Sequence, residues 1–189
     1  MSSTVYLVRH ATPDWSRTDL RYDIPPGPPL TPQGEEEATR LGAFLRQAGV
    51  QRIYASPLER ARRTAELAAV VAEADVNEEP AVAEWVRGES ETAVLERFLP
   101  LWAAACVESE ECGALALVTH GGPIRLLLQH LKLEQSVIDF YRKQFDRDNP
   151  LPPAGAWRIT RKNPDALWQM ELSFTPQPFR RYEPETVTV

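Results

Sequence analysis

Short apolar runs alternate along this chain with segments patterned as amphipathic helices, and this alternation constrains the fold more than any other feature. Expected strands cover residues 4–8, 52–55, 81–83 and 114–118, the third being the weakest. Helical patterns begin near Thr31, Ser56, Ser90 and Pro123. The alternation predicts an α/β fold, a three-layer α/β/α sandwich with a mostly parallel central sheet. A final strand pair is expected at residues 156–160 and 167–172.

Local signals place the helix ends. Thr31 precedes Pro32, an arrangement typical of an N-cap followed by proline in the first helical position. Ser56 and Glu59 have the spacing of a capping box, with the helix running to about Ala74. Pro100 is expected to break or kink the helix that starts at Ser90.

The composition is that of an ordinary globular domain. The chain has 189 residues, 43% of them hydrophobic, so we expect one domain over residues 1–175 and a proline-containing tail over 176–189. Its formal charge is −6, from 21 basic and 27 acidic side chains, which disfavours a general nucleic-acid surface. No apolar run is long enough for a membrane span, and the first residues do not resemble a signal peptide, so the cytoplasm is the expected location. Cys106 and Cys112 are expected to be reduced, with a cystine between them as the alternative.

Polar side chains follow each of the four predicted parallel strands. Arg9 and His10 follow the first strand, residues 56–63 the second, Glu84 the third, and His120 with Gly121 the fourth. The carboxyl ends of parallel strands meet at one edge of a sheet, where ligands bind. Two of the three histidines therefore lie at that edge with several arginines and one carboxylate.

This set of residue types points to phosphoryl transfer. Arginine offers donors that match phosphate oxygens, and backbone N–H groups at a helix start attract anions. A neutral imidazole acts as a nucleophile, and a nearby carboxyl group gives and takes a proton. The residues therefore suggest transfer through a phosphohistidine, with arginine instead of a metal balancing the charge.

The same residues resemble the histidine phosphatase superfamily, which has the phosphoglycerate mutase-like fold. The resemblance spans residues 5 to about 131 and rests on five ordered pieces: Leu7-Val8-Arg9-His10-Ala11, Leu30-Thr31-Pro32-Gln33-Gly34-Glu35-Glu36-Glu37-Ala38, Ser56-Pro57-Leu58-Glu59-Arg60-Ala61-Arg62-Arg63-Thr64-Ala65, Glu84, and Val118-Thr119-His120-Gly121-Gly122.

The resemblance implies a role for each matching residue. His10 would be the nucleophile, and Glu84 would protonate the leaving oxygen and then activate water. Arg9, Arg60 and His120 would hold the phosphoryl oxygens with the amide of Gly121. Neither a metal nor another cofactor is implied, and the expected partner is a small phosphomonoester, with no nucleic acid and no membrane.

The sequence also departs from the family's commonest pattern. Ala11 stands where a glycine is usual, Thr12 where a glutamate is frequent, and Ser16 where an asparagine often follows the position of Trp15. Only 36 positions separate Glu84 from His120 (120 minus 84), too few for the insertion that mutase members carry. The resemblance therefore favours the compact phosphatase branch over a mutase.

Several alternatives remain open at this stage. Glu89 rivals Glu84 as the proton donor, and Arg62 and Arg63 are expected on the surface, with Arg63 pairing with Glu59. A substrate wall is expected from the following residues, with loop packing as the alternative: Thr12, Trp15, Ser16, Arg17, Arg21, Tyr22, Trp85 and Arg87.

The function also has rivals. Phosphoglycerate mutase-type transfer and a non-catalytic phosphate- or phosphoprotein-binding module are the alternatives. A metal-dependent hydrolase is disfavoured because no HExxH motif exists. The substrate stays open between a sugar phosphate, α-ribazole phosphate and a phosphoprotein. The oligomeric state, the role of the tail and the role of the proline-dense loop at residues 25–29 also stay open.

Overall fold

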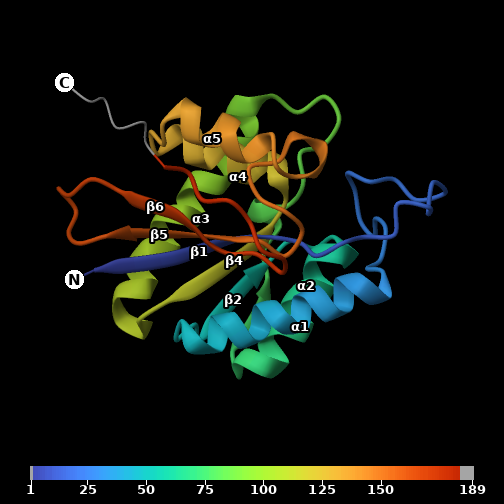
Figure 1. Ribbon diagram of the computed structural model, residues 1–189, viewed down its shortest axis with the longest axis horizontal. Helices are drawn as coiled ribbons and strands as arrows, with labels where there is room; N and C mark the ends of the chain where they lie inside the picture. Colours follow the sequence, from blue (N-terminus) through green and yellow to red (C-terminus); the bar gives the residue numbers. More distant parts are fainter. Residues whose placement is uncertain (1, 184–189) are drawn as a thin grey trace.

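The computed structural model describes residues 2–183, and in it strands and helices alternate as expected (Figure 1). Two short 3-10 helices are η1 (Pro80–Val82) and η2 (Asp146–Asp148). The strands are β1 (Ser3–Arg9), β2 (Arg52–Ala55), β3 (Asp75–Glu78), β4 (Leu115–Thr119), β5 (Ala156–Arg161) and β6 (Gln169–Phe174). The α-helices are α1 (Pro32–Gln47), α2 (Glu59–Ala72), α3 (Glu91–Cys112), α4 (Gly121–His130) and α5 (Gln135–Arg142).

One six-stranded sheet forms the middle layer, with the strand order β3-β2-β4-β1-β5-β6. The first four of these strands are parallel, and β5 and β6 join them antiparallel. Helices α1 and α2 cover one face, and α3, α4 and α5 cover the other (Figure 1). The three-layer α/β/α sandwich with a mostly parallel sheet is therefore confirmed.

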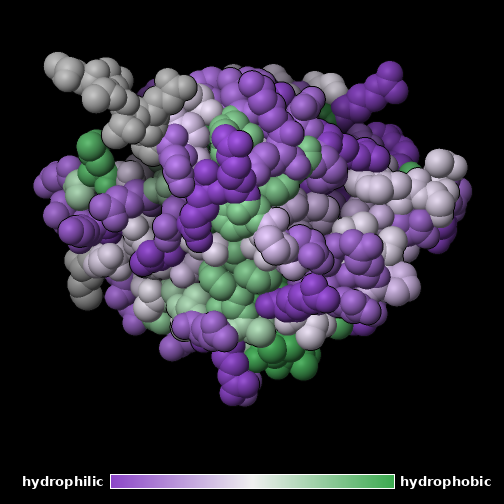
Figure 2. All heavy atoms as spheres, in the orientation of Figure 1, coloured by the Kyte–Doolittle hydropathy of each residue, from purple (hydrophilic) through white to green (hydrophobic). Residues whose placement is uncertain are grey.

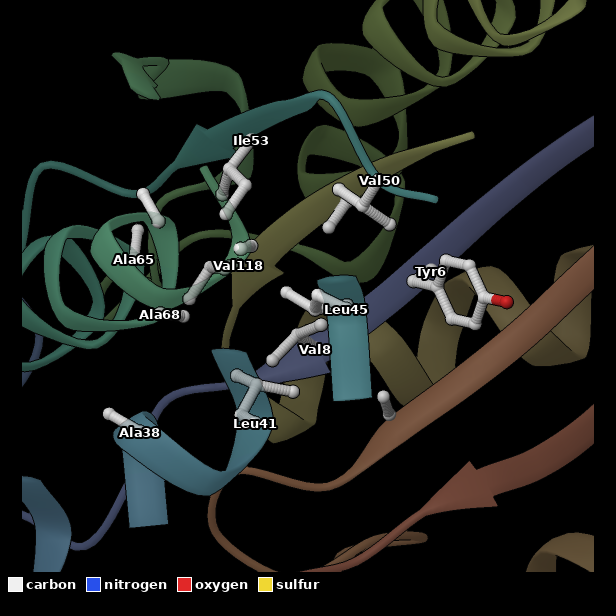
Figure 3. Close-up of a cluster of buried hydrophobic side chains, with 14 of the residues drawn as sticks. Tyr6, Val8, Ala38, Leu41, Leu45, Val50, Ile53, Ala65, Ala68 and Val118 are labelled. Atoms are coloured by element: carbon white, nitrogen blue, oxygen red, sulfur yellow. The ribbon is translucent and has the colours of Figure 1, made fainter. Parts of the chain in front are cut away.

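Alternating side chains of β1 supply both halves of the core. Tyr6 and Val8 pack toward α1 and α2, whereas Val5 and Leu7 pack toward the other helix layer. This is the two-residue period of a strand that is buried on both faces. Figure 3 shows the first of these clusters, in which β1, β2 and β4 meet α1 and α2.

Small residues let α1 and α2 approach closely. The inward positions of α2 include Ala61, Ala65 and Ala68, whereas Val70 is 79% exposed. A Cβ added to Gly42 of α1 would lie 2.5 Å from the backbone oxygen of Ala68. Backbone packing at this point leaves no room for a side chain.

The third predicted strand is wrong. Residues 81–83 do not form a strand, because Pro80 begins the 3-10 helix η1, which the side chain of Glu79 caps at Ala81. The strand beside β2 is β3 at the sheet edge, where Asp75, Asn77 and Glu78 are exposed and only Val76 packs against the core. An edge strand needs no apolar face pattern, so the hydrophobic signal was absent where the strand lies.

Two predicted helix boundaries also differ. Thr31 caps α1 as expected, but α2 begins at Glu59 without a side-chain cap, and Ser56 contacts His120 instead. Helix α3 continues through Pro100 to Cys112. Pro100 is exposed, so the carbonyl that loses its helical donor there faces water.

The beginning of the predicted tail packs against its own chain. Phe179 and Tyr182 contact the core cluster beneath α5, and the amide of Tyr182 donates to the hydroxyl of Tyr141 at 3.0 Å. Residues 184–189 of the tail lie outside the described residues. Both cysteines are free, as expected.

Hydrophilic side chains cover most of the face in Figure 2, and hydrophobic ones gather near the middle and lower edge of the view. Over the part of the chain that the structure describes, no helix has the length and apolar character needed to cross a membrane.

The close approach at Gly42 gives a stability prediction. Helix propensity alone predicts that Gly42→Ala stabilises the protein by about 1 kcal/mol. We expect the opposite, a loss of about 1–3 kcal/mol, because the added methyl group meets the backbone of α2. Chemical unfolding of wild type and variant measures the difference, and a variant more stable than wild type would show that the two helices separate easily.

Candidate active site

The five principal candidate residues converge at the carboxyl edge of the sheet. Arg9 ends β1 and His10 follows it, while His120 is the N-cap of α4 directly after β4. Arg60 lies in the first turn of α2, and Glu84 follows η1. The rings of His10 and His120 have centroids 5.1 Å apart, and all five residues are buried.

His10 presents one ring nitrogen without a partner. Its Nδ1 lies 2.8 Å from the carbonyl oxygen of Ala11. A carbonyl only accepts, so Nδ1 carries the proton and Nε2 carries the lone pair. Nε2 is buried and makes no hydrogen bond. Burial, then the charges of Arg60 and Arg9, lower the pKa of His10 well below its usual value. The ring is therefore neutral near pH 7 and has a free lone pair.

His120 is held by two polar neighbours. Its Nε2 lies 2.8 Å from Oγ of Ser56, and its Nδ1 lies 3.3 Å from Oε2 of Glu84. Burial, then the charge of Arg60, lower the pKa of His120 well below its usual value as well. Ser56 thus positions a site residue, a role that the capping-box prediction missed.

Arg60 and Glu84 form a buried ion pair. Nη2 of Arg60 donates to Oε2 of Glu84 at 3.2 Å, and Nη1 donates to the carbonyl of Tyr22 at 2.9 Å. The other oxygen of Glu84 accepts the amide of Trp85 at 2.8 Å. The rival carboxylate, Glu89, pairs with Arg97 outside this cluster.

Arg9 is anchored by a residue that sequence reasoning missed. Its two terminal nitrogens donate to the two oxygens of Asp146 at 2.6 and 2.8 Å, and Nη1 also donates to the carbonyl of Leu151 at 3.1 Å. Burial of Asp146 raises its pKa, but the hydrogen bonds and charge of Arg9 outweigh burial, and the pKa lies below its ordinary value. No local signal marks Asp146, because its partner lies 137 positions away in the sequence.

Part of the predicted substrate wall lies beside the cluster. The ring of Tyr22 covers the guanidinium of Arg60, with 4.1 Å between the centroid and Cζ, and stacks on Trp15 with centroids 5.1 Å apart. Trp85 lies near Gly122, since a Cβ added there would be 3.5 Å from its ring. Gly121 opens α4, and a Cβ on it would clash with the side chain of Asn149.

Other predicted wall residues are hydrogen-bonded to acidic side chains. Ser16 bonds to Asp14, Arg17 to Asp19, and Arg21 to Asp23. Thr12 bonds to Glu37 through both its amide and its hydroxyl.

Two hollows flank the stack of Tyr22 and Trp15. One, of about 350 Å³, includes Thr12, Trp15 and Asp146 in its lining. The other, of about 500 Å³, is lined by Arg21, Tyr22, Asp23, Trp85 and Arg87. The predicted wall is therefore divided between two spaces.

The arginines expected on the surface lie outside the cluster. Arg62 pairs with Glu59 and Glu66 along its own helix. Arg63 pairs with Glu35 of α1 instead of Glu59. Among the described residues, no group of three or more His, Cys, Asp or Glu side chains is arranged to hold a metal ion.

Known proteins are similar to parts of this sequence. A sequence model described as the histidine phosphatase superfamily (branch 1) matches residues 5–92 and 78–149. A probable phosphoglycerate mutase GpmB from Escherichia fergusonii is 35% identical over 88 residues, 47% of this chain. The aligned part spans only 40% of that relative's length.

Solved structures share the fold at low identity. A phosphoglycerate mutase from Bacillus anthracis superposes with a TM-score of 0.71 at 16% identity, covering 91% of this chain and 92% of the other. A mycobacterial glucosyl-3-phosphoglycerate phosphatase superposes with a TM-score of 0.69 at 18% identity, covering 91% and 98%.

The buried neutral histidines predict how stability depends on pH. In the unfolded chain, His10 titrates near pH 6.5, whereas its folded pKa is lower. Below about pH 6.5 the unfolded state binds more protons, so the stability contributed by neutral His10 falls as the pH drops toward the folded pKa.

We expect His10→Gln to reduce the slope of unfolding free energy against pH by about 1.4 kcal/mol per pH unit between about pH 6.5 and 5. Urea unfolding of wild type and variant measures the two slopes, and His130→Gln, at an exposed position, is the control. Equal slopes for His10→Gln and wild type would contradict the assignment of a neutral buried ring.

Proposed function

Because the chain belongs to the histidine phosphatase superfamily (branch 1), we propose that it is a phosphomonoester hydrolase that works through a phosphohistidine on His10 without a metal. The observation that carries the proposal is the unpartnered Nε2 of His10, buried beside Arg9, Arg60, Glu84 and His120. A free lone pair and two arginines at one point suit attack on a phosphorus atom.

The first step transfers the phosphoryl group to His10. Nε2 attacks phosphorus, the N–P bond forms, and the bond to the ester oxygen breaks. Glu84, protonated in the substrate complex, gives its proton to the leaving oxygen, so that a neutral alcohol departs. Arg9, Arg60, His120 and the amide of Gly121 hold the three remaining oxygens.

The position of Glu84 supports this exchange. In the free protein, its Oε2 lies between Nη2 of Arg60 at 3.2 Å and Nδ1 of His120 at 3.3 Å. A phosphoryl oxygen taking that place would accept from Nη2 of Arg60 and would lie close to Nδ1 of His120, which is buried without a hydrogen-bond partner in the free protein. The displaced carboxyl group would then face the leaving oxygen, on the side where Trp85 and the hollow of about 500 Å³ lie.

The second step returns the enzyme to its starting state. Glu84, now a carboxylate, removes a proton from water as the water oxygen attacks phosphorus and the N–P bond breaks. Phosphate leaves, and His10 regains its neutral form with the proton on Nδ1. The bond from Nδ1 to the carbonyl of Ala11 keeps the same nitrogen available throughout.

The connection between Glu84 and His120 favours hydrolysis over mutase-type transfer. The described chain there forms a loop, the helix α3 and the strand β4. None of these is an added segment folded over the site, which suits a centre that admits water to the second step. Phosphoglycerate mutase-type transfer remains the alternative, since relatives and structural neighbours include proteins with that name.

The nucleophile assignment gives the first activity test. We expect His10→Ala to lower kcat on p-nitrophenyl phosphate by a factor of about 10³ or more, because no other described group replaces the lone pair. His130→Gln is the matched control and should keep the wild-type rate. A strong chelator should leave the wild-type rate unchanged. Wild-type turnover in His10→Ala would remove the proposal.

The proton-donor assignment gives a second test. Glu84→Gln keeps the size of the side chain but cannot donate a proton as a carboxylic acid. We expect kcat to fall by about 10²–10⁴ on an alkyl phosphate and clearly less on p-nitrophenyl phosphate, whose leaving group needs no proton. A comparison of the two substrates on one variant separates chemistry from folding. Equal losses on both would assign Glu84 a binding role only.

A further inference from the structure

The two buried arginines of the site are already balanced by carboxylates. Arg9 faces Asp146 through two hydrogen bonds, and Arg60 faces Glu84. His10 and His120 are neutral near pH 7, since burial first and then nearby arginines lower the pKa of each. These six side chains therefore carry little net positive charge with which to bind a phosphomonoester dianion. When Glu84 is protonated, their net charge rises by only one. Another cation is needed to favour a dianion over a monoanion.

A short segment crosses the site beside these groups. It comprises residues 146–149 and is called the strap below. At one end of the strap, Asp146 holds Arg9, and at the other end the side chain of Asn149 lies against Gly121. Arg147 stands between them, so its Cα is fixed between two residues that contact the site.

The side chain of Arg147 lies against the same aromatic stack that covers Arg60. Its Cζ is 3.6 Å from the centroid of the Trp15 ring, Trp15 packs against Tyr22 at a tilt of 34°, and the ring of Tyr22 lies over Arg60. The order Arg147–Trp15–Tyr22–Arg60 joins an exposed arginine to a buried one. Stacking of this kind orients a guanidinium plane while leaving its N–H groups free in that plane.

The strap has strained backbone that its contacts maintain. Arg147 and Asp148 have φ values of 52° and 55°, in the left-handed region, which an arginine seldom adopts and an aspartate adopts more readily. Nε of Arg142 donates to the carbonyl of Asp148 at 2.9 Å, and the amide side chain of Asn149 donates to the carbonyl of Asp146 at 3.2 Å. Strain held in this way is found most often where a side chain must be placed for function.

No ion pair joins Arg147 to a carboxylate within residues 2–183. Arg17 and Arg21, two exposed arginines of the site's rim, pair with Asp19 and Asp23. Arg87, which lines the hollow of about 500 Å³, also has no ion pair within the described residues, but it is not stacked on the Trp15–Tyr22 pair. The charge of Arg147 also reaches the nucleophile, because it is among those that lower the pKa of His10, after burial, Arg60 and Arg9. Arg147 is therefore the oriented, unneutralised cation near His10.

We propose that Arg147 is a substrate-binding residue that donates to the phosphoryl group and makes the site selective for dianionic phosphomonoesters. The proposal rests on the proposed function for the identity of the anion. Trp15 is the positioning residue that keeps the guanidinium in place, and Asp146 fixes the strap by holding Arg9.

Binding of inorganic phosphate tests the proposal without any turnover. Calorimetric titration at about pH 8, where phosphate is a dianion, is carried out at about 20 and about 200 mM KCl. We expect Arg147→Gln to weaken binding about tenfold, the effect of one charge-assisted hydrogen bond, and to reduce the dependence on salt. Arg147→Lys, which keeps the charge without the planar fork, should fall between.

Arg161→Gln is the matched control. Arg161 also lies over a tryptophan, Trp168, with 4.3 Å between Cζ and the centroid. In the sheet, however, Arg161 of β5 is aligned with Ser3, at the end of β1 that lies away from the site. This variant should bind phosphate as wild type does. A double-mutant cycle of Arg147→Gln with Trp15→Leu separates positioning from general stability, since we expect the second change to weaken binding much less when Arg147 is absent.

Each outcome bears on one proposal. Phosphate binding by Arg147→Gln equal to that of wild type, at both salt concentrations, would overturn the role of Arg147 even if His10-dependent hydrolysis is found. Binding that depends on Arg147 in a protein without phosphatase activity would support the role of Arg147 while removing the proposed hydrolase function.

Discussion

Burial of Arg9 and Arg60 at the end of the central strands is the constraint on which the site depends. Moving a charged group out of water costs several kcal/mol unless partners replace its hydration. Asp146 and Leu151 replace it for Arg9, and Glu84 and a backbone carbonyl replace it for Arg60. Burial, and after it the positive charge of the nearby arginines, lowers the pKa of His10 and His120 and keeps both rings neutral. The two arginines thus supply donors for an anion and contribute, after burial, to the neutral state of His10.

The sheet brings these groups together from distant parts of the sequence. Strands β1 and β4 are neighbours, with Arg9 opposite Thr119, so His10 and His120 both emerge just beyond paired residues. Strand β2 lies on the other side of β4, and the helix after it carries Arg60 to the same edge. Close packing of α1 against α2 through small residues such as Gly42 and Ala68 keeps α2, and with it Arg60, in place. The geometry of the site therefore follows from strand order and close packing.

The sequence was sufficient to predict the centre of the site because its signals are local. Apolar runs mark β1, β2 and β4, and parallel topology then places the residues after them at one edge. The strand β3 was missed because it is a polar edge strand. The strap was missed because a polar, aperiodic segment gives no pattern, and Asp146 and Arg147 act through Arg9 and Trp15 far away in the chain. Arg17 and Arg21, by contrast, were expected in the substrate wall and pair with acids two positions away.

The central claim is that Nε2 of His10 accepts the phosphoryl group. Rapid quenching of wild-type protein with a ³²P-labelled phosphomonoester, followed by peptide mapping under alkaline conditions, tests it most directly. The account predicts an acid-labile, base-stable label on the peptide that contains His10, with phosphorus on Nε2, and no such label in His10→Ala. An acid-stable label, or a label on a residue other than His10, would contradict it.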